Sequence, residues 1–425
     1  MIDRRQFLAG TAAASAMPSV LHSALRPDFA PGNVEHCIHI WLGGGACHVD
    51  TWDPKIKGDP KLKKPGSYYE AINTSVPGLQ VCEHLSKCAK VMEHFSLLRS
   101  VHHKAVDEHA AATNEMHTGR PVSGTIVYPS IGSAVAHERG KATDGAPAYV
   151  VMGYPNLTRG PGFLGAQHGF VYLTNTENGP AGLSRPTNIS TSRQAARDRL
   201  LGVARKSFVQ RNPKDTVIRQ YNDAIGESQE LMSGEFMDAF NLKSESGSLR
   251  NAYGGEFGQR CLLARRLIQQ GVRFQEVSFN LNFVNGTGWD THNAGQLKQH
   301  LIIQQLDQAL ATLVTDLQAH KLLDKTLIVV STEFGRPPEF DGGGGRGHQS
   351  RAFTVALAGG GLNNGQAIGV TDEIGKKVVE RPISVPDLFA TIHWAMGVNP
   401  SKNLYDGDRP VPITDHGKPV RELFV

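Results

Sequence analysis

The sequence has few cysteines, no apolar run long enough to cross a membrane, and little excess charge of either sign. Its five cysteines are an odd number, which does not suit a disulfide framework, and we predict no bridge. The formal net charge is only +4 and the basic residues are dispersed, so no concentrated surface for nucleic acid or anionic membrane is expected. No internal repeat is apparent.

The composition is that of a globular protein with many turns. At 425 residues and 40% hydrophobic content, the chain can bury a sizeable core in one large α/β domain or two smaller ones. The 46 glycines and 23 prolines indicate long loops, which often carry a functional site on a rigid sheet.

The first residues match a twin-arginine export signal. Arg4-Arg5-Gln-Phe-Leu precedes the short apolar stretch 7–16, which ends in small residues. We interpret residues 1–33 as signal and tether and residues 34–425 as the folded domain; an ordinary N-terminal helix is the alternative. Similarity to this signal class implies export of the folded protein, by the twin-arginine machinery, to the periplasm or the outside of the cell.

The stretch 326–331 has the pattern of a central strand. It is a short β-branched and apolar run without alternation, which is typical of a strand covered on both faces in a parallel sheet. Glu333 and Arg336 follow directly, at the strand's carboxyl end, where open α/β sheets bind their ligands. A Glu and an Arg that merely solvate a turn are the simpler interpretation of this segment alone.

A second strand is expected at 37–42, breaking at Gly43-Gly44-Gly45, where glycines allow a tight turn or a close approach to a ligand. His48, Asp50 and Asp53 follow, and an extended chain would point His48 and Asp50 to one side. Such residues form part of a metal site, although Asp53 before a proline is also ordinary turn chemistry.

A helix of about three turns is expected between Asp107, a plausible N-cap, and Gly119, a plausible C-terminal stop. His109 falls in its first turn, where free N–H groups favour an anion. The remaining expected elements are helices at 81–95, 192–209, 215–238, 253–270 and 294–320 and from Ser384 to Met396, strands at 96–101, 273–279 and 352–358, and an insertion at about 155–250. The helix 294–320 carries an apolar stripe of leucines at 297, 301, 306, 310, 313 and 317 that should pack on the sheet.

Carboxylates and imidazoles recur at successive strand ends. Such recurrence is what a divalent-metal hydrolase requires, with Arg336 or Arg346 stabilising developing negative charge, although any single histidine is more often structural. Zinc suits mixed imidazole and carboxylate ligands, whereas calcium, magnesium or manganese would fit an oxygen-rich version. The predicted metal ligands are His48, Asp50, Asp53, Asp290, His292, Glu333 and His348, and the predicted catalytic residues are His109, Arg336 and Arg346.

The segment from His300 to Gly335 resembles the alkaline-phosphatase-like and sulfatase superfamily, in which a helix with a Leu-Asp pair precedes a strand ending in Asp-His-Gly. Here the pair is Leu306-Asp307 and the strand end is Glu333-Phe334-Gly335. Thr118-Gly119-Arg120 looks like the Thr-Gly-Arg that follows a sulfatase nucleophile, and 383–391 looks like the C-terminal helix motif.

A narrower resemblance, over nearly the whole mature chain, is to the exported proteins of domain of unknown function family fifteen-hundred-and-one. It rests on the motifs at 43–45, 50–55, 288–292 and 332–336. This resemblance implies an alkaline-phosphatase-like α/β/α sandwich with a mostly parallel central sheet, but no established chemistry. In the superfamily's pattern Phe334 replaces a metal-binding His, and no Cys, Ser or Thr occupies the nucleophile position.

Counting back nine residues from Thr118, the sulfatase spacing, places His109 at the nucleophile position. His109 could attack phosphorus, bind the metal or cap its helix. A helix N-terminus disfavours imidazolium, so we expect a neutral ring. The predicted function is an exported, metal-dependent hydrolase of phosphate or sulfate esters of small molecules or polysaccharides. The alternative is a non-catalytic envelope protein that binds metal or glycan on a degenerate fold.

Overall fold

The computed structural model describes residues 27–104, 108–153, 157–173, 180, 188–233, 235–280, 288–292 and 295–425. The twin-arginine motif at Arg4 and Arg5 and the expected cap residue Asp107 lie outside these residues. Within these ranges, no helix has both the length and the apolar character needed to cross a membrane.

A nine-stranded sheet forms the centre of the fold, with strand order β10-β4-β9-β8-β1-β7-β5-β6 and with β13 paired to β4. Strand β9 runs antiparallel to its neighbours β4 and β8, and the other pairings within this sheet are parallel. The α/β fold with a mostly parallel sheet is therefore confirmed. The strands are β1 His36–Trp41, β4 Phe95–His102, β5 Tyr149–Met152, β6 Val171–Leu173, β7 Phe274–Ser278, β8 Thr326–Ser331, β9 Phe353–Gly359, β10 Gln366–Ile368 and β13 Ile383–Ser384.

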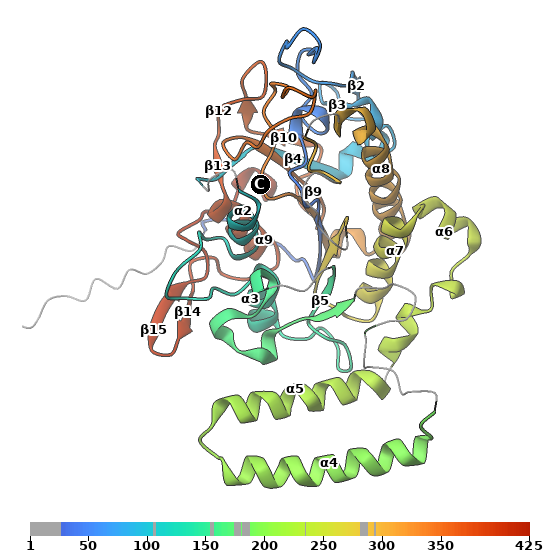
Figure 1. The fold of residues 1–425 in the computed structure, drawn as a ribbon, viewed down its shortest axis with the longest axis vertical. Helices are drawn as coiled ribbons and strands as arrows, with labels where there is room; N and C mark the ends of the chain where they lie inside the picture. Colours follow the sequence, from blue (N-terminus) through green and yellow to red (C-terminus); the bar gives the residue numbers. More distant parts are fainter. Residues whose placement is uncertain are drawn as a thin grey trace, which may run out of the picture.

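Helices cover both faces of this sheet (Figure 1), which explains the apolar strands. On β8, Ile328 and Val330 join the buried cluster formed with α7 and α8, whereas Leu327 and Val329 join the cluster formed with α2, α3 and α9. A strand buried on both faces needs apolar residues at every position, so the predicted run at 326–331 is confirmed as β8. The helices are α2 His109–Thr118, α3 Ile131–Arg139, α6 Gly247–Tyr253, α7 Glu256–Gln269, α8 Gln296–Ala319 and α9 Val385–Ala395.

The leucine stripe of α8 packs only in part as predicted. The four leucines from Leu306 onward are fully buried, but Leu297 and Leu301 are 65% and 49% exposed. These two residues lie in the first turns of α8, so the contact of the stripe with the core begins only further along the helix.

The helix predicted at 81–95 is not an α-helix. The chain forms the end of β3 (Gln80–Cys82) and two 3₁₀ helices, Glu83–Leu85 and Cys88–His94. The backbone N–H groups of Lys87 and Cys88 donate to the carboxylate of Asp307 on α8. These two N–H groups thus bind a side chain that is distant in the sequence instead of carbonyls of their own segment. The apolar periodicity of residues 81–95 does not indicate such a tertiary contact.

Helices α4 (Thr191–Arg211) and α5 (Thr216–Ser233) lie side by side as a separate layer beneath the sheet in Figure 1. They fall within the region predicted as an insertion. Three short hairpins complete the described secondary structure: β2 (Ala71–Asn73) with β3, β11 (Val370–Thr371) with β12 (Val378–Glu380), and β14 (Asn403–Asp406) with β15 (Arg409–Pro412).

Candidate metal centre

The loops after β1, β7 and β8 meet at one edge of the sheet because these strands are parallel neighbours. Gly44, with φ of +119°, brings its backbone against Asp290, and a Cβ there would stand 2.5 Å from the Asp290 nitrogen. Its own N–H donates to Oε1 of Glu333 at 2.7 Å. The glycine turn predicted after the first strand thus joins the residues that follow the other two strands.

Five side chains converge beside this turn, and we call them the edge cluster. Asp290 Oδ1 is their common point, with His292 Nε2 at 3.2 Å and the Nε2 atoms of His109 and His348 each at 3.6 Å. His292 and His348 approach each other at 3.0 Å between their Nε2 atoms. Donor atoms of His109, Asp290 and His348 all lie within 4.8 Å of one another. The members of the edge cluster are His109, Asp290, His292, Glu333 and His348.

Glu333 orients His109. Its Oε1 lies 2.7 Å from Nδ1 of the ring, and because a carboxylate accepts, Nδ1 donates and Nε2 is turned toward Asp290. Oε2 of Glu333 accepts in turn from the hydroxyl of Thr332. A carboxylate that fixes the ring of a histidine ligand is common around protein-bound metals. The N–H of Gly44 and the hydroxyl of Thr332 were not predicted as parts of the site, since neither residue type is itself a metal ligand of the expected kind.

His109 does not cap its helix. Glu108 does so, accepting from the N–H groups of Ala110 and Ala111, and Gly119 with φ of +72° ends the helix as predicted. Burial lowers the pKa of His109, but hydrogen bonds to Asp290 and Glu333 outweigh burial and raise the pKa to about 9. The two carboxylates thus favour the charged ring, contrary to the expectation of a neutral ring at a helix N-terminus. A metal ion bound at Nε2 would replace the proton there.

Phe334 forms the floor of the cluster. It is fully buried, and its ring lies 5.0 Å from that of His109 and 4.5 Å from that of His348, between centroids. The side chain of His292 is 37% exposed, so the cluster remains open to solvent on that side. Phe334 stands where the superfamily pattern has a metal-binding His, and His348, from the loop before β9, supplies an imidazole from another part of the chain.

The predicted ligands Asp50 and Asp53 are engaged elsewhere. Both oxygens of Asp50 are bound by the fully buried guanidinium of Arg346, at 2.8 and 2.9 Å. They also accept from Gln296 and from the N–H of Tyr68. Asp53 pairs with Lys55 at 3.1 Å, with Arg99 at 3.4 Å and with the hydroxyl of Thr371. These partners correct the assignment of Asp50 and Asp53 as ligands, because their charges are already compensated.

His48 and the two predicted catalytic arginines also have structural contacts. Nε2 of His48 lies 2.7 Å from the carbonyl of Gly375, a contact outside the edge cluster. Arg346 donates to the carbonyls of Pro337, Pro338 and Gly66 besides Asp50. It therefore faces the protein interior, not a substrate. We accordingly leave His48 and Arg346 out of the candidate centre.

Arg336 supports the centre from beneath. Its guanidinium donates to Asp290 Oδ1 and to the carbonyls of Gly44, Gly45 and Arg346, and the side chain is fully buried. With its donors directed at these oxygens, Arg336 positions Asp290 and the glycine turn. This arrangement corrects the prediction that it stabilises charge developing on a substrate.

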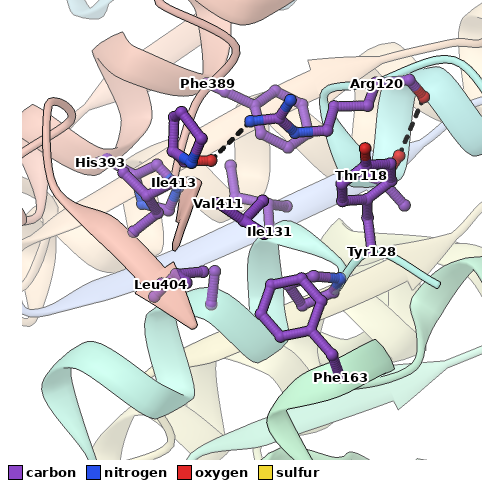
Figure 2. A pocket seen from close by; sticks show the side chains of 13 residues that line it. Thr118, Arg120, Tyr128, Ile131, Phe163, Phe389, His393, Leu404, Val411 and Ile413 are labelled. Atoms are coloured by element: carbon purple, nitrogen blue, oxygen red, sulfur yellow. Dashed lines mark hydrogen bonds between the residues drawn. The ribbon is translucent and has the colours of Figure 1, made fainter. Parts of the chain in front are cut away.

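The Thr-Gly-Arg motif points away from the edge cluster. Figure 2 shows Arg120 reaching toward the C-terminal hairpin, where it donates to the carbonyl of Pro412 and pairs with Asp415 at 2.7 Å. The pocket drawn there, between Tyr128, Phe389 and β15, encloses only about 10 Å³. That volume is about what one water needs, so the pocket is too small for an ester substrate.

Comparisons with known proteins give one family and several distant structural likenesses. A sequence model of the family described as "Protein of unknown function (DUF1501)" matches residues 34–424. No curated protein matches the chain. Among solved structures, the chain is similar to the PsFucS1 sulfatase from Pseudoalteromonas sp., with 12% identity, TM-score 0.39, and coverage of 92% of this chain and 76% of that chain.

A protein in the alkaline phosphatase superfamily from Vibrio parahaemolyticus is similar at 12% identity and TM-score 0.38, over 98% of this chain and 78% of that chain. The phosphonate monoester hydrolase of Agrobacterium radiobacter is similar at 12% identity and TM-score 0.35, over 91% and 78% of the two chains. Likenesses this distant do not carry a functional conclusion, and we derive the function from the geometry of the site.

Proposed function

The chain belongs to the DUF1501 family, and we propose that it is a metal-dependent hydrolase of phosphate or sulfate esters whose reaction centre is the edge cluster. The spacing of its donor atoms carries the proposal. Ligands about 2.0–2.1 Å from a tetrahedral ion lie about 3.3 Å from one another. The imidazole nitrogens of His109, His292 and His348 lie 3.2 to 3.6 Å from Asp290 Oδ1.

The same donors suit zinc by chemistry. The donors that lie within 4.8 Å of one another, the imidazoles of His109 and His348 and the carboxylate of Asp290, form a mixed nitrogen and oxygen set. Zinc accepts such a set more readily than calcium or magnesium does. Glu333 and Arg336 hold two of these donors in place from behind, by contacts with His109 and Asp290. A divalent ion bound here would polarise a phosphoryl or sulfuryl oxygen and activate the attacking group.

Water is the attacking group that this arrangement favours. His109 occupies the nucleophile position by sequence register, but its Nδ1 is bound to Glu333 and its Nε2 faces Asp290 and the ring of His348. Both ring nitrogens are therefore directed at other members of the cluster, as in a ligand. Of the three roles considered for His109, we propose the ligand. Direct attack by water on a chiral phosphate ester would invert the configuration at phosphorus, whereas a phosphohistidine intermediate would retain it.

The second candidate function is a non-catalytic protein that binds metal or glycan. It is favoured by one observation: the position that carries the nucleophile in the resembled enzymes holds His109, not Cys, Ser or Thr. The hydrolase and the metal-binding form of this alternative share the metal and differ in turnover. They are separated by measuring both quantities on the same preparation.

The test is elemental analysis of the purified chain together with a screen of phosphomonoester, phosphodiester and sulfate ester substrates. We expect bound zinc and turnover in the wild type, and in the double variant Asp290→Asn, His348→Gln we expect loss of turnover and of the zinc held by the edge cluster. His320→Gln, a change at a solvent-facing histidine at the end of α8, is the matched control and should retain both. Metal that the double variant loses, in a wild type without turnover, would select the metal-binding protein. A wild type that takes up no metal at the edge cluster would exclude the hydrolase and leave only the glycan-binding form of the alternative.

We propose in addition that the chain is exported by the twin-arginine machinery, on the basis of Arg4 and Arg5. Replacing both with Lys should retain the protein in the cytoplasm, as judged by cell fractionation. The control is a paired Lys replacement at Arg197 and Arg199, which lie far from the signal in the sequence. Unchanged export of the Arg4, Arg5 variant would exclude this route.

A further inference from the structure

A second group of metal-binding side chains lies inside the fold, and we call it the interior cluster. It consists of His39, His117 and Glu276, which are 5%, 1% and 0% exposed. His39 on β1 and Glu276 on β7 are partners in the parallel register, and His117, on the last turn of α2, lies against them. One donor atom from each residue lies within 4.8 Å of the other two.

In each of the two histidine rings, one nitrogen is engaged in a hydrogen bond to another described residue and the other is not. Nδ1 of His117 lies 2.7 Å from the carbonyl of Thr113, and because a carbonyl only accepts, Nδ1 carries the hydrogen. Nε2 of His39 lies 2.6 Å from the hydroxyl of Ser331, which leaves its Nδ1. Histidines that bind a metal commonly use the other ring nitrogen in this way.

The three remaining atoms are buried and lack hydrogen-bond partners within the described part of the chain. They are Nδ1 of His39, Nε2 of His117 and Oε2 of Glu276. Nε2 of His117 and Oε2 of Glu276 face each other at 3.2 Å, outside hydrogen-bond geometry. That separation is close to the spacing of about 3.3 Å between neighbouring ligands of a tetrahedral ion.

The protonation states also suit a cation. Burial lowers the pKa of His39 to about 3, so its ring is neutral and offers a lone pair. Burial would raise the pKa of Glu276, but Arg159 and His117 hold it well below its usual range, so Glu276 is a carboxylate. Arg159 donates to the other oxygen, Oε1. A proton on Nε2 of His117 could join only two of the three unpartnered atoms, whereas one metal ion could bind all three.

We propose that His39, His117 and Glu276 bind a zinc-class metal ion in a buried site that is separate from the edge cluster. Two imidazoles and one carboxylate are a donor set that zinc takes in proteins. The ring of Trp41 packs on His117 at 4.4 Å between centroids, which shields the site from solvent. The ion joins α2 to β1 and β7, and since α2 begins at His109, the interior site steadies the helix that presents His109 to the edge cluster.

The two sites are distinguished by counting metal in the full chain by mass spectrometry after dialysis against a weak chelator, with zinc as the probe. The edge variant Asp290→Asn, His348→Gln should retain one zinc per chain, and adding Glu276→Gln or His117→Gln should remove it. His393→Gln, a fully buried histidine on α9 outside both clusters, is the matched control and should keep the zinc. Because the starting variant lacks the edge cluster, this result does not depend on the proposed function.

X-ray absorption of the zinc-loaded edge variant identifies the ligands of the bound zinc and requires no substitution in the interior cluster. Two imidazoles and a carboxylate oxygen at about 2.0–2.2 Å are expected. A folded edge variant without zinc after growth and dialysis in zinc would overturn the interior site. Zinc that remains bound after replacement of both His117 and Glu276 would also overturn the interior site, as would a zinc coordination shell without imidazole.

Discussion

The guanidinium of Arg336 lies against the carboxylate of Asp290, with Nη2 donating to Oδ1 and both side chains buried. The same oxygen is the common point of three imidazoles, so Arg336 fixes the atom around which the candidate metal centre is arranged. Arg336, which follows Glu333 after β8, therefore affects the candidate metal centre indirectly, by holding Asp290 in place. This arrangement makes stability the first property to change when Arg336 is altered.

Arg336→Lys should lower the free energy of unfolding by about 1 to 3 kcal/mol for each buried acceptor that it leaves without a donor. A lysine ammonium cannot reach Asp290 and the carbonyls of Gly44, Gly45 and Arg346 at once. Urea denaturation measures the change. Arg351→Lys, at an exposed position nearby, should leave the midpoint almost unchanged; equal stability of the two variants would contradict the role given to Arg336.

Gly44→Ala should destabilise the fold and loosen metal binding together. The residue has φ of +119°, and its new Cβ would meet the backbone of Asp290 at 2.5 Å. The backbone conformation alone costs about 1 to 3 kcal/mol for a residue other than glycine. Thermal unfolding and metal content measure the two effects. Gly78→Ala, which has a positive φ but open space around it, separates backbone strain from the clash; equal effects of the two changes would show that the clash is unimportant.

Asp50→Asn should destabilise the protein without removing metal from the edge cluster. The change leaves Arg346 buried without its counter-charge, which costs about 3 to 5 kcal/mol. Glu422→Gln is the matched control, because Glu422 also binds an arginine through both oxygens but at an exposed position. Exposed pairs contribute less than about 1 kcal/mol. Loss of metal at unchanged stability in Asp50→Asn would restore the prediction that Asp50 is a ligand.

His109→Ala should remove metal from the edge cluster and leave α2 helical, since Glu108 and Gly119 cap that helix. Elemental analysis and circular dichroism measure the two outcomes. Thr113→Ala, on the same helix, controls for a general effect of altering α2 and should keep the metal. If His109→Ala retains full metal but loses turnover, the residue is the nucleophile and direct attack by water is excluded.

Local sequence patterns determined many of the elements and much of the edge cluster. An unbroken apolar run predicted β8, a strand was also predicted where β1 lies, and Ser384 with Asp387 forms the capping box that begins α9. Since parallel strands end at one edge, the polar residues that follow β7 and β8 had to meet there. Asp290, His292 and Glu333 were predicted on that ground, and His348 as part of the same strand-end pattern.

Only the tertiary structure decided which polar side chains are compensated and which converge. Asp50 and Arg346 are nearly 300 positions apart in the sequence, yet they satisfy each other in the interior. His39 and Glu276 are polar residues within buried strands, and their meeting with His117 depends on the pairing of β1 with β7 and on the packing of α2. The free energy of a buried charge is set by its nearest partners, and those partners come from distant parts of the chain. Local composition can therefore suggest a ligand, but the fold determines whether its charge is already satisfied.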